Sequence, residues 1–361
     1  MTVIDCDAHV EEGLETWNYL DPAFYRQRPF PVLFPEDTVF GAHNAAWVID
    51  YKIRLYGGTP TIMKRAEQKG AAIDVQELTD VEGRLAVMAE AGLDKQIVFP
   101  TLWQGPVAED PDLETALAQS WNTFMATQCG KSEGRLWFAA VIPYRQPDKA
   151  VAEIRRVKEM GSAAGIYTHG IEWDMPLSNP GFWPIYEEAA RQDLPILLHT
   201  GNTSPTLRHM VEYYPRPDRQ QFPQTNPYAA GLNQVLYGFA QLMGSGVMED
   251  FPKLRMAVLE IGCDWAPLVV KGMRERRSAN VADWLGERIF VACAVGDDLS
   301  YVVDRLGDDF LITASDFPHG DAFREDRLAE QLEKRGDLSA STIEKILSGN
   351  PSRAFSLTVE A

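Results

Sequence analysis

The chain has 361 residues, of which 45% are hydrophobic and 24% charged, as in an ordinary soluble globular protein with a large core. Its net charge of −18 repels phosphate backbones, which argues against a nucleic-acid-binding protein. The sequence shows no signal peptide, no uncharged apolar stretch near the ~18 residues of a membrane span and no C-x-x-C motif, so we expect a cytoplasmic protein without a membrane partner.

Apolar runs and amphipathic segments alternate along the chain. The runs predict eight buried strands, near residues 2–6, 95–99, 136–142, 163–168, 195–199, 254–260, 288–293 and 310–315. The amphipathic segments predict helices near 77–91, 112–129, 147–160, 181–192, 232–247, 264–277, 297–306 and 321–335. A last helix is expected at 342–348, opened by a capping box of Ser341 and Glu344.

Eight βα units in order favour an α/β fold of the (β/α)8 TIM-barrel type over an open doubly wound sheet. No Gly-rich loop follows the first strand, which argues against dinucleotide binding. We expect one domain over residues 1–361. Two long inserts, 13–75 after strand 1 and 201–231 after strand 5, follow strand C-termini and predict a lid or substrate wall over the site. The alternative is a packing subdomain or an oligomer contact.

Five of the apolar runs end in side chains that bind metals or move protons. These are Asp7 with His9, His169, His199, Glu260 and Asp316. A parallel barrel collects the C-terminal ends of its strands at one face, where its chemistry takes place. The five runs therefore predict one shared site, and the residue types indicate a divalent metal.

Four of these residues are the expected metal ligands. Asp7 and His9 are two apart on a strand, so their side chains point to the same side. Strand 8, which ends at Asp316, neighbours strand 1 in a closed barrel, and strand 5, which ends at His199, lies across the barrel mouth. Two imidazoles and two carboxylates suit one divalent metal, Zn²⁺ or alternatively Mn²⁺, with positions left open for substrate.

Three other residues are predicted to assist at the site. His169 would orient the substrate, or else be a hydrogen-bonded histidine of the rim. Glu260 would move a proton or support a ligand, or else form a structural salt bridge with a nearby arginine. His319 would hold Asp316 in place. The sequence has no G-x-S-x-G motif and no cysteine arranged as a nucleophile, which disfavours covalent catalysis.

At these residues the chain resembles the amidohydrolase superfamily, and within it the amidohydrolase-related branch of aminocarboxymuconate semialdehyde decarboxylase and the aromatic-acid decarboxylases. The matching stretches are 4–9, 84–94, 195–201, 315–319 and 349–355. The resemblance implies Asp7, His9, His199 and Asp316 as the metal set, and a homodimer. The chain departs from the commonest pattern at Asp7, where many members have histidine, and at Glu260, where many have a catalytic histidine.

The resemblance makes non-oxidative decarboxylation of a small aromatic or unsaturated carboxylic acid the leading hypothesis. The metal would chelate the substrate, Asp316 would protonate the carbon that loses CO2, and Arg54, Lys64 or Arg208 would anchor the acid. The nearest alternative is a metal-dependent hydrolase of an amide or lactone, with Asp316 as the base. A remote alternative is a non-catalytic binding module, which would hold no metal.

Overall fold

The computed structural model describes residues 1–33, 45–54, 71–201, 203–207, 231–275, 281–319 and 324–358. Its centre is a sheet of eight parallel strands, one from each predicted apolar run. In spatial order they are β1 (Ile4–Val10), β5 (Lys95–Pro100), β6 (Leu136–Val141), β7 (Ala163–Thr168), β10 (Ile196–Leu198), β11 (Met256–Val258), β12 (Ile289–Cys293) and β13 (Leu311–Thr313). Spatial order follows chain order, which confirms the predicted barrel.

The sheet comes close to closing into a barrel where the chain after β13 meets β1. The backbone N–H of Asp316 donates to the carbonyl of Asp7 at 2.8 Å, and the N–H of His9 donates to the carbonyl of Phe317 at 2.5 Å. The last strand is thereby joined to the first at its C-terminal end, where the candidate ligands lie.

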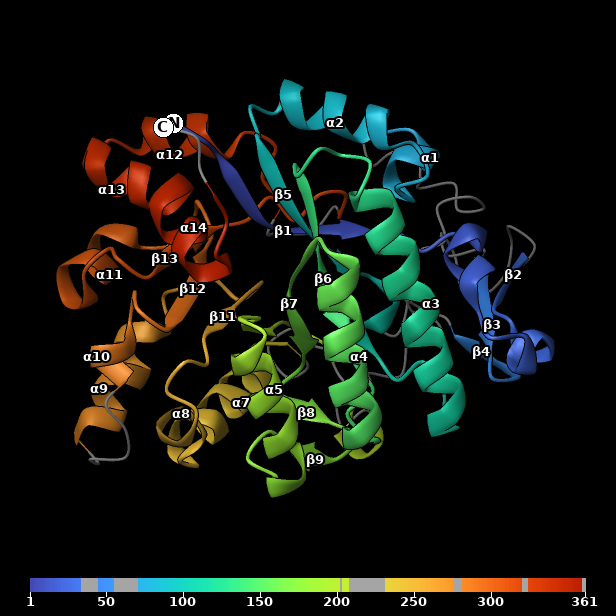
Figure 1. Ribbon diagram of the computed structural model, residues 1–361. Helices are drawn as coiled ribbons and strands as arrows, with labels where there is room; N and C mark the ends of the chain where they lie inside the picture. The colour runs from blue at the N-terminus through green and yellow to red at the C-terminus, as the bar shows by residue number, and fades with distance from the viewer. Residues whose placement is uncertain are drawn as a thin grey trace, which may run out of the picture.

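Helices surround the barrel on all sides (Figure 1). They agree with the predicted segments, although the eighth begins seven residues later than predicted, at Leu328 rather than 321. The helices that follow successive strands are α2 (Val81–Glu90), α3 (Pro111–Cys129), α4 (Pro147–Met160), α5 (Trp183–Arg191), α7 (Asn233–Gly244), α9 (Ala266–Glu275), α11 (Leu299–Leu306) and α12 (Leu328–Arg335). Shorter helices are α1 (Ile73–Gln76), α8 (Val247–Asp250) and α10 (Val281–Trp284).

The predicted capping box at the last helix is wrong. Helix α13 (Ala340–Glu344) begins two residues earlier than expected, and its N-cap is Ser339, whose Oγ accepts from the N–H of Thr342 at 3.0 Å. Both serines have the right chemistry for a cap, and the chain places the helix start at the first of them. A π-helical turn (Lys345–Gly349) and α14 (Asn350–Phe355) follow.

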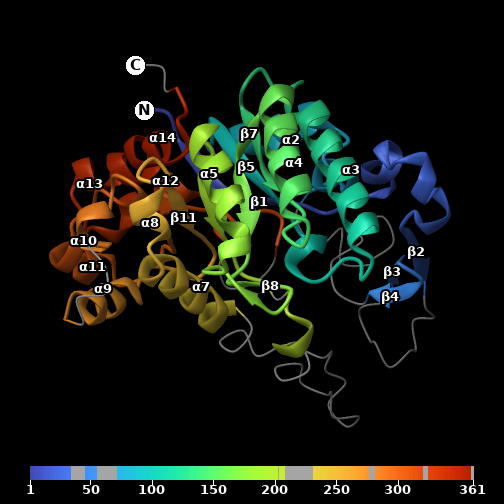
Figure 2. The same ribbon diagram turned by 60° about the horizontal axis from the view of Figure 1, so that its bottom comes forward.

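The first insert contains secondary structure that the sequence pattern did not predict. Its described part holds the 3-10 helices η1 (Leu14–Tyr19) and η2 (Pro22–Gln27) and an antiparallel sheet of β2 (Phe30–Leu33), β3 (Ala45–Ile49) and β4 (Lys52–Arg54). Edge-to-face packing of Trp17 on Trp47, with ring centroids 6.2 Å apart, joins η1 to this sheet. The insert lies beside α3, away from the barrel axis (Figures 1 and 2).

A small antiparallel hairpin, β8 (Ile171–Glu172) with β9 (Met175–Pro176), follows β7 on the C-terminal side of the barrel. Residues 34–44 and 55–70 of the first insert and 208–230 of the second lie outside the described residues. Among the residues that the structure describes, no helix is both long and apolar enough to cross a bilayer.

Candidate metal centre

Strand β1 carries the first two candidate ligands inside the barrel mouth. It runs to Val10, four residues beyond the predicted end, so Asp7 and His9 belong to the strand itself. Both side chains are fully buried, and Asp7 Oδ1 lies 3.5 Å from His9 Nε2. The Nδ1 atom of His9 donates to the carbonyl of Pro100 at 3.3 Å, which turns Nε2 toward the centre.

His199 reaches the same point from the opposite side of the barrel. It follows β10, and its Nε2 lies 3.3 Å from Asp7 Oδ2. Its Nδ1 donates to the carbonyl of Thr200 at 2.9 Å, so this imidazole also presents Nε2 to the centre. Both histidines thus donate Nδ1–H to a backbone carbonyl, which leaves Nε2 as the atom that would bind a metal.

Asp316, the fourth predicted ligand, approaches the centre through His9, because its Oδ1 lies 3.5 Å from His9 Nε2. Its candidate donor atom groups with those of His9 and His319. Asp316 follows β13 at a positive φ of 54° and is 1% exposed. Oδ1 also lies 2.9 Å from Nδ1 of His319, and Nε2 of His319 lies 3.1 Å from the hydroxyl of Thr101. The structure therefore places His319 beside Asp316, as expected.

Glu260 contacts a candidate ligand directly. Its Oε2 lies 2.9 Å from His199 Nε2, and the hydroxyl of Thr200 donates to the same oxygen. Among the described residues, the ion-pair partner of Glu260 is His199 rather than an arginine. Within the described chain, one atom each of Asp7, His9, His199 and Glu260 lie within 4.8 Å of one another.

The donor atoms fit a divalent cation. Within the described part of the chain, neither carboxylate oxygen of Asp7 nor Nε2 of His199 makes a hydrogen bond of acceptable geometry, although all three are buried. Such atoms are costly unless something neutralises them. Burial raises the pKa of Asp7 to about 7. Burial alone would lower the pKa of His199, but the negative charges of Asp7 and Glu260 have the larger effect and raise the pKa of His199 well above its usual value.

The buried donor atoms of the site are of the types that could bind a divalent metal. Comparison with known proteins identifies the family. The family profile described as Amidohydrolase matches residues 4–357. The chain belongs to the amidohydrolase family.

The chain is similar to a gamma-resorcylate decarboxylase of Polaromonas sp., with 22% identity over 314 residues that cover 81% of this chain and 90% of the relative. An amidohydrolase of Mycobacterium avium subsp. paratuberculosis shares its fold, with a TM-score of 0.78, 19% identity and coverage of 99% and 98% of the two chains. A dihydroxybenzoic acid decarboxylase of Polaromonas sp., solved with manganese and the inhibitor 2-nitroresorcinol, gives a TM-score of 0.64, with 18% identity and coverage of 98% and 97%.

His169 lies outside the group of candidate ligands. Its Nδ1 lies 3.0 Å from Glu172 Oε1, which also accepts from the backbone N–H of His169 at 2.8 Å, so Nδ1 carries a proton. Its Nε2 lies 3.1 Å from the hydroxyl of Tyr167, whose ring packs against His199 with centroids 5.6 Å apart. Sequence reasoning missed Tyr167 and Glu172 because neither is the residue that ends one of the predicted apolar runs.

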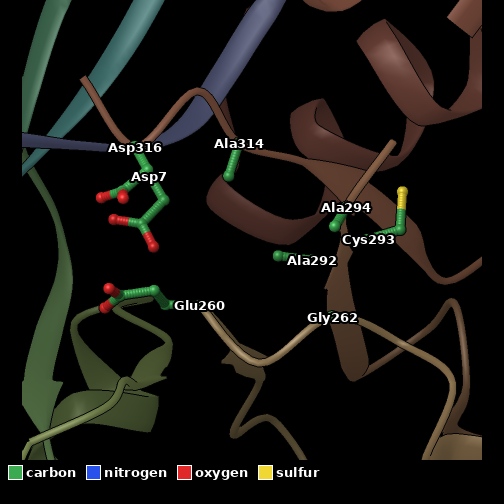
Figure 3. Close-up of a pocket in the computed structure, with 8 residues that line it drawn as sticks. All are labelled: Asp7, Glu260, Gly262, Ala292, Cys293, Ala294, Ala314 and Asp316. Carbon is green, nitrogen blue, oxygen red and sulfur yellow. The ribbon is translucent and has the colours of Figure 1, made fainter. Parts of the chain in front are cut away.

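A cavity opens beside the carboxylates of the centre. Figure 3 shows Asp7, Asp316 and Glu260 facing the same space, which the small residues Gly262, Ala292, Ala294 and Ala314 border. The remaining predicted contacts cannot be placed against it. Arg208 and Lys64 lie outside the described residues, and of Arg54 the structure describes the backbone in β4 alone.

Proposed function

We propose that this amidohydrolase is a metal-dependent, non-oxidative decarboxylase of a small aromatic carboxylic acid. The observation that carries the proposal is the convergence of two imidazoles and two carboxylates, all buried, at the C-terminal mouth of the barrel. The relative and the manganese-bound neighbour, both named as decarboxylases of hydroxylated aromatic acids, support this reaction over others of the family.

One divalent metal, Zn²⁺ or Mn²⁺, would be held by Asp7, His9, His199 and Asp316. When bound, it supplies a positive charge that orients the substrate through its carboxylate and a neighbouring oxygen. Asp7 would offset part of the charge of the ion, and Asp316 would do so whenever it is not protonated. The carbonyls of Pro100 and Thr200 keep the two histidines in the ligand tautomer, so the chain needs little rearrangement on loading.

Asp316 would deliver the proton that the reaction consumes. Decarboxylation turns a carboxylate and a proton into a C–H bond and CO2. Asp316 protonates the ring carbon that bears the carboxylate, the C–C bond then breaks, and its electron pair restores the aromatic ring. His319, 2.9 Å from Asp316 Oδ1, holds the carboxyl in place, and solvent restores its proton.

The other residues would orient the ring and the ligands. Glu260 and Thr200 hold His199, and His169 contacts the substrate with Glu172 fixing its tautomer. The small residues Gly262, Ala292, Ala294 and Ala314 border the cavity beside Asp316. Cytoplasmic location and a homodimer remain predictions, and light scattering on purified protein tests the dimer.

The test uses full-length protein stripped with a chelator and reloaded with Zn²⁺ or Mn²⁺. We expect CO2 and the matching phenol from at least one hydroxybenzoate, with Asp316→Asn slower by about 10²-fold or more. If the protein releases ring-opened acids from lactones or cyclic amides and no CO2 from any acid, the decarboxylase hypothesis is wrong and the hydrolase hypothesis is supported. If the protein binds no metal and turns over no substrate, the remaining hypothesis is a non-catalytic binding module.

A further inference from the structure

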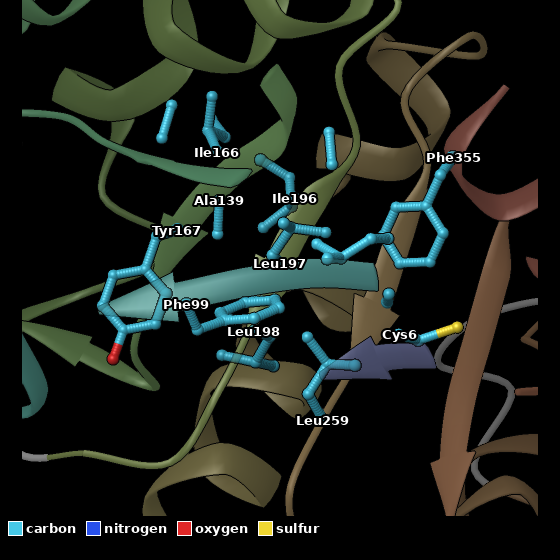
Figure 4. Close-up of a cluster of buried hydrophobic side chains, with 14 of the residues drawn as sticks. Cys6, Phe99, Ala139, Ile166, Tyr167, Ile196, Leu197, Leu198, Leu259 and Phe355 are labelled. Carbon is cyan, nitrogen blue, oxygen red and sulfur yellow. The ribbon is translucent and has the colours of Figure 1, made fainter. Parts of the chain in front are cut away.

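Strand β1 contains an irregularity next to the candidate centre. From Asp5 to Ala8 it advances three residues, while the paired stretch of β5 from Gln96 to Val98 advances two. One extra residue is therefore inserted in β1 at Cys6 and Asp7, which is a β-bulge and breaks the alternation of side chains. Cys6 belongs to the buried hydrophobic cluster (Figure 4), while the next residue, Asp7, faces the centre (Figure 3).

Asp5 accepts the hydrogen bonds that hold this bulge. Its Oδ1 accepts from the backbone N–H of Asp7 at 3.3 Å and from the N–H of Ser315 at 2.8 Å. Its Oδ2 accepts from Ser315 Oγ at 2.6 Å and from Gln96 Nε2 at 2.7 Å. One fully buried carboxylate thereby ties β1 to β5 and to the chain after β13.

Arg84 extends the network from helix α2. Its Nε donates to Gln96 Oε1 at 2.8 Å, and its Nη2 donates to the carbonyl of His9 at 3.1 Å. The guanidinium lies over the ring of Phe317, 4.2 Å from its centroid, next to Asp316. Burial lowers the pKa of Arg84 to about 9, so the side chain still carries its charge at pH 7.

We infer that Asp5, Arg84, Gln96 and Ser315, here named the Asp5 clasp, position Asp7, His9 and Asp316 for metal binding. All four are at most 3% exposed, and none has a donor or acceptor in the group of candidate ligands. The clasp bonds the backbone of Asp7 and the carbonyl of His9, and Ser315 precedes Asp316. It therefore acts through the backbone of three candidate ligands at once. The inference rests on the proposed metal role of those three residues.

Zinc affinity tests the clasp without any need for turnover. Arg84→Met keeps an unbranched, flexible stem and removes the guanidinium donors. We expect it to raise the Zn²⁺ dissociation constant of the full-length protein by about 10- to 100-fold, measured by competition with a chromophoric chelator. Asp5→Asn, which removes the charge at nearly constant shape, should act in the same direction.

Arg288→Met is the matched control for general destabilisation. Arg288 also donates to backbone carbonyls, those of Met248, Leu254 and Phe251, and lies over an aromatic ring, that of Trp284. It precedes β12, at the end of the barrel remote from the centre. We expect it to lower the melting temperature as Arg84→Met does, but to change zinc affinity by less than about threefold.

Three outcomes decide the matter. The inference is wrong if zinc affinity is unchanged in Arg84→Met and Asp5→Asn. It is also wrong if Arg288→Met lowers zinc affinity as much as the clasp variants do. If either clasp variant fails to fold, Ser315→Ala, which removes a single hydroxyl, serves as the test. This variant must weaken zinc binding severalfold, and its Co²⁺-loaded form must have a visible spectrum that differs from that of the wild type. If the wild-type protein binds neither zinc nor manganese, the proposed function itself is refuted. Unchanged zinc affinity in the variants of a wild-type protein that binds zinc refutes the clasp alone.

Discussion

The Oε2 atom of Glu260 lies 2.9 Å from Nε2 of His199, and the hydroxyl of Thr200 donates to that same oxygen. Glu260 adopts a positive φ of 55°, which aims its side chain back at the candidate centre. The carboxylate therefore adds a third negative charge to the pair of aspartates, at a position where the resemblance leads one to expect histidine.

Glu260→Gln should weaken zinc binding by about tenfold. The carboxylate attracts the metal, and it also attracts the proton on His199 that the metal must displace. A divalent ion carries twice the charge of the proton, so removing the carboxylate weakens metal binding more than proton binding. Competition with a chromophoric chelator at pH 7.5 gives the affinity. Glu172→Gln is the control, because Glu172 is a buried carboxylate bonded to a histidine outside the ligand group. Equal zinc affinity in wild type and Glu260→Gln would contradict the assignment.

Zinc affinity should fall at least tenfold per unit as pH drops below about 7. Burial raises the pKa of Asp7 to about 7, so below that pH a proton occupies the carboxylate in the metal-free protein and zinc must displace it. The proton on His199 competes in the same direction. Titrations between pH 5.5 and 8 measure the slope, and an affinity independent of pH would exclude Asp7 as a ligand.

Zinc should also stabilise the metal-free protein. A ligand at 100 times its dissociation constant adds about 2.7 kcal/mol to the free energy of unfolding, which raises the melting temperature by several degrees. Thermal unfolding of chelator-treated protein with increasing Zn²⁺ measures the effect. His9→Asn should abolish it. A rise of equal size in that variant would place the zinc elsewhere on the chain.

The sequence predicted the barrel because eight apolar runs, each bounded by a helix-like segment, leave few other arrangements. It also predicted that Asp7, His199 and Asp316 would meet, since the C-terminal ends of parallel strands share one face. It placed Glu260 in the same site but left open whether this residue would move a proton, support a ligand or form a salt bridge with an arginine. The direction of its side chain depends on a turn with positive φ after β11.

The role of Asp5 was equally hidden from the sequence. Strict alternation would put Asp5 and Asp7 on one face of β1, whereas the bulge sends Asp5 to Gln96 and Ser315. An extra residue in one strand has no local signature, because it is set by pairing with a strand about 90 residues away. The short strands of the first insert escaped notice since proline and aromatic residues obscure their pattern.

Gly201→Ala should displace His169. A Cβ at this position would lie 2.3 Å from Cδ2 of His169 and 2.8 Å from the carbonyl oxygen of Gln104, and the φ of +142° disfavours alanine as well. We expect a loss of about 2–3 kcal/mol in the free energy of unfolding, together with lower kcat/KM. Gly272→Ala, in α9 with nothing within 4 Å of the added Cβ, should instead be neutral or stabilising by about 0.5–1 kcal/mol. If the two variants have equal free energies of unfolding, the ring of His169 moves away from the added Cβ without loss of stability, and the prediction is wrong.

Glu188→Gln should destabilise the protein at neutral pH but not in acid. Burial alone would raise the pKa of Glu188, but hydrogen bonds from Arg155, Arg191 and Gln192 lower it to about 2, below the usual 4.5. Since the folded-state pKa is depressed, the stabilisation is complete above pH 4.5 and is lost as pH falls toward 2. Side-chain exposures of 53% for Arg155 and 59% for Arg191 screen the pairs. We therefore expect a deficit of about 1–2 kcal/mol at pH 7.

Urea unfolding at pH 7 and pH 3 measures this deficit, which should shrink at the lower pH because the wild-type carboxylate is then partly protonated in the unfolded chain and loses its advantage. Glu187→Gln changes the exposed neighbouring residue and should alter stability by less than about 0.5 kcal/mol at either pH. A deficit for Glu188→Gln as large at pH 3 as at pH 7 would mean that shape and packing, rather than the charge of Glu188, join α4 to α5 at this point.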